Sequence, residues 1–133
     1  MTFSEIHRVL ETRMASWAGG YPVDWPGVPP SAALQKARSE MTPWVRLTIR
    51  HGDSATACIG DAPAERHPGV VLLQVFVAEG EGIRPATQIA DSLAEHFRYF
   101  QQGHLATQAA SLTHVDPANG WQQVNLTIPF RAG

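Results

Sequence analysis

The segment Gly69–Ala78 constrains the fold more than any other part of the chain. Its residues are apolar at both odd and even positions, with Gln74 as the single polar exception. Successive side chains of a strand point to opposite faces, so a strand of this composition is covered on both faces. We therefore predict that Gly69–Ala78 is a central strand against which the other elements pack.

The segment Trp44–His51 has the pattern of a strand with only one face in the core. Val45, Leu47 and Ile49 alternate with polar or larger side chains. This alternation predicts that the three aliphatic residues face the core, while the opposite face meets water or a partner.

The last third of the chain predicts a hairpin. Strands are expected at about Leu105–Val115 and Trp121–Phe130, because Asp116–Gly120 between them is a strong turn signal. Pro129 cannot donate a hydrogen bond to a neighbouring strand. We therefore expect Pro129 to lie at a sheet edge or at the end of its strand.

Two segments have the apolar spacing of an amphipathic helix. From near Thr2 to Trp17, apolar residues recur at steps of three and four, and Thr2 with Glu5 forms a capping-box signature. Pro85 predicts the start of the second helix, since proline is tolerated at the first helical position. Gly103 is expected to end that helix.

Two long connectors are predicted to be mostly irregular. Gly19–Pro43 holds five of the ten prolines, although Ser31–Glu40 has the composition of a short helix. Gly52–Pro68 is polar, with a short strand possible at Ala55–Ile59.

The order of these elements predicts an α+β fold in one domain over residues 1–133. We expect a mixed, mainly antiparallel sheet of four to five strands, with two helices packed on one face.

Composition excludes several classes of function. The net charge is −2 and the basic residues are scattered, so the chain lacks the positive surface that binds nucleic acid. No apolar run approaches the ~20 residues that cross a bilayer, and the N-terminus lacks the pattern of a signal peptide. The single cysteine, Cys58, fits a reducing compartment. We expect a soluble protein that stays in the cytoplasm.

No motif indicates catalysis or a bound cofactor. The six histidines lack the spacing of a zinc-binding pair, and we expect all of them at surface or loop positions. Cys58 has no surrounding nucleophile motif and is interpreted as a small buried hydrophobe. The turn at Gly80–Gly82 is acidic where a phosphate loop is electropositive. We therefore predict no catalytic, metal or cofactor site.

Four residues are candidates for a subunit or partner interface: Trp25, Trp44, Arg46 and Arg50. Trp25 lies in the proline-rich connector, and the other three lie on the polar face of their strand. Tryptophan and arginine are enriched at interface hot spots. Two interpretations remain open. The connector folds back over Trp44 as a minor core, or one or both tryptophans anchor a neighbouring subunit.

Several short motifs follow one another along nearly the whole chain: Phe3–Ile6, Leu10–Arg13, Trp17-Ala18, Trp25-Pro26, Pro43–Arg46, His51-Gly52, Gly69–Val77 and Trp121–Phe130. Their order and spacing resemble those of phage tail-terminator proteins, of the kind similar to minor tail protein U and encoded by phages and prophages.

This resemblance implies a structural α+β subunit without enzymatic activity or cofactor. Such subunits assemble, typically as a hexameric ring, on the last ring of a finished tail tube. They stop polymerisation there and present a surface to the head-completion or neck proteins, while DNA passes through without specific binding. The implied partners are further copies of the chain, the tail tube protein and a neck protein. The implied locations are the cytoplasm of the bacterial host during assembly and then the virion tail.

The alternative, from a different class, is a small cytoplasmic ligand-binding or regulatory domain, for which the sequence indicates no ligand.

Overall fold

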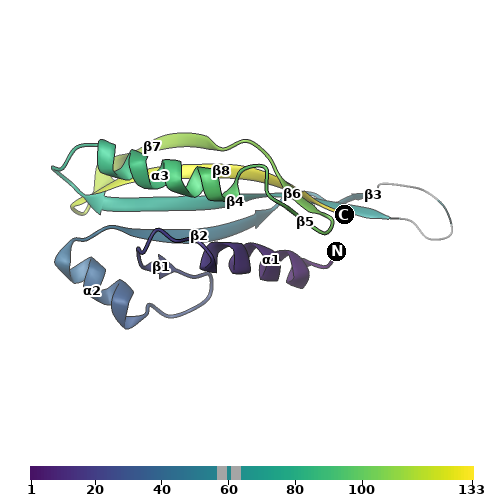
Figure 1. The fold of residues 1–133 in the computed structure, drawn as a ribbon, viewed down its shortest axis with the longest axis horizontal. Helices are drawn as coiled ribbons and strands as arrows, with labels where there is room; N and C mark the ends of the chain where they lie inside the picture. Colours follow the sequence, from purple (N-terminus) through teal and green to yellow (C-terminus); the bar gives the residue numbers. More distant parts are fainter. Residues whose placement is uncertain (57–59, 61–63) are drawn as a thin grey trace.

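The computed structural model describes residues 1–56, 60 and 64–133. These residues form three helices and one curled sheet of eight strands (Figure 1). The helices are α1 (Phe3–Ala15), α2 (Ala32–Glu40) and α3 (Arg84–Phe97). The strands are β1 (Val23–Asp24), β2 (Trp44–His51), β3 (Ala55–Thr56), β4 (Glu65–Ala78), β5 (Gln101–Gln102), β6 (Leu105–Thr107), β7 (Ser111–Ala118) and β8 (Trp121–Ala132). Cys58 and the last three residues of the predicted strand Ala55–Ile59 lie outside the described residues.

The expectation of four to five strands with two helices on one face is wrong, although the fold is α+β and the sheet is mixed. The strands β1, β3, β5 and β6 are only two or three residues long, so they are too short to show a two-residue period. The additional helix, α2, packs on the opposite face of the sheet from α1 and α3.

The long strands β2, β4 and β8 form the centre of the sheet, each antiparallel to its neighbour. β1 lies parallel to β2 at one edge, whereas β7 and the β5–β6 hairpin lie along the other side of β8. The predicted central segment Gly69–Ala78 does lie between β2 and β8. Beyond β2, β4 pairs with β3, and this hairpin extends from the body of the sheet (Figure 1).

One face of the sheet, here called the inner face, is covered by α1 and α3. Both helices and alternate positions of the three long strands contribute to one continuous core. Leu47, Leu73 and Leu126 lie side by side across β2, β4 and β8, and each is at most 3% exposed. Arg13 of α1 donates two hydrogen bonds, of 2.7 and 2.9 Å, to the carbonyl oxygen of His96 in α3. These bonds join the two helices.

The first helix begins where its capping box predicts. The Thr2 hydroxyl accepts a hydrogen bond from the Glu5 N–H at 3.1 Å, which satisfies one of the free amides of the first turn. Ile6, Leu10 and Met14 are buried on the side of α1 that faces the sheet. The helical spacing of these residues therefore indicates the buried side correctly.

The second predicted helix, α3, ends earlier than expected. It stops at Phe97, because the Thr107 hydroxyl donates to the Phe97 carbonyl and accepts from the Phe100 N–H at 2.8 Å. These bonds satisfy backbone groups that a further helical turn would otherwise use. Gly103, the expected stop, lies instead in the turn between β5 and β6. Its φ of 58° is a conformation that glycine adopts without strain.

The predicted strand Leu105–Val115 is two strands, β6 and β7, separated by residues 108–110. The Gln108 N–H donates to the Pro129 carbonyl at 2.9 Å, so the backbone of Pro129 faces this gap. The missing N–H of Pro129 therefore interrupts no strand pairing, and β8 continues to Ala132 between β4 and β6. The expectation that Pro129 marks an edge or a strand end is wrong for this reason.

Candidate partner-binding face

The opposite face of the sheet, here called the outer face, carries the side chains that alternate with the core. Neighbouring positions on β2, β4 and β8 form four rows across this face. The rows are Trp44, Phe76 and Gln123; Arg46, Gln74 and Asn125; Thr48, Leu72 and Thr127; and Arg50, Val70 and Pro129. α2 lies at the Trp44 end of the sheet (Figure 1), so the first rows and the last rows have different surroundings.

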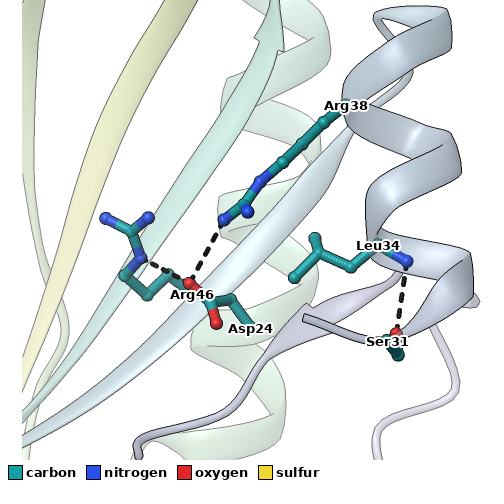
Figure 2. Close-up of polar contacts among 5 residues, drawn as sticks. All are labelled: Asp24, Ser31, Leu34, Arg38 and Arg46. Carbon is teal, nitrogen blue, oxygen red and sulfur yellow. Dashed lines mark hydrogen bonds and ion pairs between the residues drawn. The ribbon is translucent and has the colours of Figure 1, made fainter. Parts of the chain in front are cut away.

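α2 packs over the first row as a small second core. Ser31 starts the helix, since its hydroxyl accepts a hydrogen bond from the Leu34 N–H at 3.2 Å (Figure 2). Leu34 and Ala37 then pack on Trp44 and Phe76. The Trp44 and Phe76 rings are stacked with centroids 4.1 Å apart. Stacked aromatic rings in a dry contact hold a helix of only nine residues on the sheet.

Asp24 of β1 connects the second row to α2. One oxygen of the Asp24 carboxylate lies 2.8 Å from Arg46 Nε and 3.4 Å from Arg38 Nη2 (Figure 2). The guanidinium of Arg38 also lies over the Trp44 ring, 4.4 Å from its centroid. Asp24 therefore ties β1, β2 and α2 together through one partly buried carboxylate.

The four predicted interface residues have different environments. Trp44 is 4% exposed beneath α2, which corresponds to the interpretation of a connector folded back as a minor core. Its Nε1 has no hydrogen-bond partner among the described residues. Trp25 is half-buried beside α1, and Arg46 is paired with Asp24. Arg50 is exposed and forms no ion pair with any described residue. Of the four, Arg50 is the most accessible to a partner.

The third and fourth rows form a surface that we call the open half of the outer face. Its members are Thr48, Arg50, Val70, Leu72, Thr127 and Pro129. The five residues other than Arg50 are half-buried. Two aliphatic side chains, two threonines, a proline and a charged rim residue make a mixed polar and apolar surface of the kind found at protein contacts.

Sequence reasoning missed Asp24 and Arg38, which organise the covered half. Both lie in the segment predicted to be a mostly irregular connector. The sequence signal for this contact was the presence of Asp24 in a segment close to two arginines, Arg38 and Arg46. Charges alone do not specify which side chains pair. The composition of Ser31–Glu40 did indicate α2 itself.

Three of the six histidines converge at the end of the inner face beside the β3–β4 hairpin. The Nε2 atoms of His7 and His51 are 2.9 Å apart, and His67 Nδ1 lies 2.7 Å from the Ser54 hydroxyl. His67 is only 7% exposed, so the expectation of surface or loop positions for all six is wrong. Burial and the nearby His7 and His67 lower the pKa of His51 from its ordinary value. Because the three residues come from α1, β2 and β4, no sequence spacing predicts the cluster.

The histidine cluster does not provide a metal centre. Within residues 1–56, 60 and 64–133, no group of three or more His, Cys, Asp or Glu side chains is arranged to hold a metal ion.

The fold is similar to a known structure, and the sequence matches a family model. One protein of known structure has a TM-score of 0.73 with this chain and is 20% identical, over 100% of this chain and 96% of the other. At that identity the likeness shows the fold alone. No curated protein sequence matches the chain significantly. The family model described as phage tail terminator protein matches residues 5–131. The chain belongs to this phage tail terminator family.

Membership of the tail terminator family confirms the resemblance inferred from the motifs. It gives the protein a structural role in a phage tail, as a component of the virion tail, and the family is of a structural, non-enzymatic kind. The tail terminator match includes α2 and all four rows of the outer face. No helix in the described part of the chain is long and apolar enough to cross a membrane.

Proposed function

We propose that this protein caps the tail tube, ends its polymerisation and forms the surface to which the head side of the virion is joined. The observation that carries the proposal is the tail terminator match over residues 5–131. The proposed partners are further copies of the chain in a hexameric ring, the tail tube protein, and a head-completion or neck protein. Assembly takes place in the cytoplasm of the bacterial host, and the protein then remains in the virion tail.

We assign partner contact to the open half of the outer face, with Arg50 at its rim. Arg46 lies in the second row next to this surface, and Trp44 is buried in the first row under α2. Trp25 is beside α1 and lines a hollow with Thr48. The assignment is supported by the apolar residues Val70 and Leu72, which face outward from a central strand. Aliphatic side chains at such positions gain stability when a partner removes them from water.

The charge of the chain is compatible with a ring through which DNA passes. Such a ring should not grip phosphate, because binding along the backbone would impede the movement of DNA. A net charge of −2 with scattered basic residues meets this requirement. The proposal therefore includes passage of DNA without specific binding.

Electron microscopy of tails tests the proposed function. Tails are assembled in host cells with the gene intact, with the gene deleted, and with the deletion complemented by the wild-type protein. Deletion should give tubes of irregular length that exceed the normal length and carry no heads, and complementation should restore uniform tails. Uniform, head-joined tails in the deletion strain would contradict a capping role.

A further inference from the structure

A groove of about 250 Å³ with a mixed polar and apolar lining lies between α3 and β7, at the side of β8 away from β2. Four alanines and two leucines line it: Ala90, Ala94, Ala109, Ala110, Leu112 and Leu126. Tyr99 and Leu112 at this groove are 73% and 40% exposed. The backbone of Tyr99 has a φ of 52°, a conformation uncommon for an aromatic residue. Exposed large apolar side chains around a concave surface are typical of a protein contact.

The edge strand β7 leaves the groove accessible to another chain. β7 pairs with β8 on one side, and all of its residues except Val115 are exposed. No other described strand pairs with its outer side. An extended segment from another chain can therefore approach the groove along β7 without displacing part of the fold.

The opposite edge of the sheet presents an extended apolar segment. Val28, Pro29 and Pro30 follow β1, and all three are exposed, Val28 to 55%. A residue that precedes proline is restricted to extended backbone, so both Val28 and Pro29 are held in that form. A segment that is already rigid loses little conformational entropy on binding. Proline-rich extended segments bind in grooves that present aromatic side chains. The α3–β7 groove presents the aromatic side chain of Tyr99.

We propose that the segment Val28–Pro30 of one copy occupies the α3–β7 groove of the next copy. The inference rests on the proposed ring and names one of its subunit contacts. β1 and β7 lie at opposite edges of the sheet, so a contact between the two edges joins copies head to tail. A head-to-tail contact closes into a ring when its rotation permits, whereas a contact between identical patches closes into a dimer.

The charges around the two surfaces are compatible with this contact. The rim of the groove exposes one acidic and one basic residue, Asp91 and Arg98. α2, which follows the Val28–Pro30 segment, exposes Lys36 and Glu40. Each side therefore carries one charge of each sign, and the contact brings no net like-charge repulsion. A contact made by one short segment is small, so isolated copies should associate weakly and the ring should form on the tube.

Nuclear magnetic resonance of the full chain tests the contact directly. A synthetic peptide with the sequence of residues 25–33 is added to the isotope-labelled protein. The expected result is a saturable shift of the amide signals of Tyr99, Ala110 and Leu112. A peptide with Val28→Asp should bind about tenfold more weakly, because the buried valine side chain is lost. The protein variant Leu112→Asp, which changes an exposed residue, should remain folded and lose the shifts.

The outcomes separate this contact from the capping function. Absence of shifts at millimolar peptide, or shifts confined to another surface such as α1, overturns the proposed contact. If wild-type protein still sets tail length in that case, the capping function stands and a different surface joins the copies. If the peptide binds in the groove but tail length does not depend on the protein, the contact stands and the capping function fails.

Discussion

The inner and outer faces of the sheet use the same three strands but differ in what covers them. On β8, the inner residues Val124, Leu126, Ile128 and Phe130 are all buried, because α1 and α3 close this face along its length. The outer residues that alternate with them are half-buried. Among the described helices, α2 alone packs on the outer face, and its apolar side chains contact the first row. An inner side chain therefore contributes to folding, while a side chain on the open half is available for assembly.

The strand β4 shows the difference in burial between the two faces most clearly. Its composition is apolar on both faces, which predicts that both faces are covered. Within this chain the prediction holds for Val71 and Leu73 on the inner face, whereas Val70 and Leu72 lie on the open half. An aliphatic pair at the centre of an uncovered sheet face is the pattern expected where another molecule completes the burial.

Truncation on the inner face should have the largest effect. Leu47→Ala removes a side chain that is 1% exposed at the centre of the main core. The variant should lose about 2–5 kcal/mol of unfolding free energy, because it leaves a cavity as well as removing apolar contact. Denaturant titration measures this loss. The neighbouring outer-face variant Thr48→Ala is the control and should lose less than about 1 kcal/mol. Equal losses would contradict the distinction between the faces.

Truncation of the small outer core should have a local effect. Leu34→Ala removes the main contact of α2 with Trp44 and Phe76, so we expect a loss of about 2 kcal/mol, at the lower end for such a change. Amide hydrogen exchange should increase within α2 and leave α1 and α3 protected. Leu34→Met conserves volume and serves as the control. Uniform loss of protection throughout the chain would show that α2 is part of the main cooperative unit.

Removal of the charge on Asp24 should have a smaller effect. Asp24→Asn keeps the shape of the side chain but ends both ion pairs with Arg38 and Arg46. These arginines are 34% and 39% exposed, so solvent screens the pairs and we expect a loss of about 1 kcal/mol or less. The difference from wild type should shrink in high salt. Glu40→Gln, which removes the charge of an exposed acidic residue of α2, is the control. An undiminished difference in high salt would contradict this account.

Acidification should lower the free energy of unfolding through the histidine cluster at the end of the inner face. The folded-state pKa of His51 is lowered, so the unfolded chain takes up this proton at a higher pH than the folded chain. The contribution to stability is fully present above the unfolded value of about 6.5 and is lost as the pH falls toward the lower folded pKa. Unfolding measured from pH 8 to 5 should show this decrease, and His7→Gln should reduce it. A contribution from this cluster that grows on acidification would contradict the assignment.

The sequence predicted those parts of the fold in which local pattern and tertiary structure agree. Thr2 caps α1, and the alternation of Val45 and Leu47 identifies the inner side of β2. The predicted turn between β7 and β8 includes Asn119 and Gly120, whose φ values of 54° and 82° suit a tight hairpin. In each case one short-range requirement selects the residue.

The features that sequence reasoning missed depend on distant partners. β1 is a strand only because β2 lies parallel to it, and the end of α3 depends on Thr107, ten residues beyond Phe97. The four candidate interface residues could be selected by residue type. The way in which the connector folds back decides that α2 buries Trp44 and that Asp24 forms an ion pair with Arg46. The sequence pattern contains no signal for the face of the sheet on which the connector packs.

The open half of the outer face is proposed to serve assembly and not folding. Arg50 is the best residue for testing it, since Arg46 is paired with Asp24 within the chain and a change there would affect both folding and assembly. The matched control is charge reversal at Glu79, which is exposed in the turn after β4.

The most direct measurement is tail length in electron micrographs for Arg50→Glu, together with its thermal unfolding. The variant should unfold like wild type, within about 0.5 kcal/mol, because Arg50 is exposed. It should nevertheless give tails of irregular excess length, since a reversed charge at the rim repels the partner. Glu79→Arg should give normal tails. Normal tails with Arg50→Glu, or a monomer that the change unfolds, would contradict the claim.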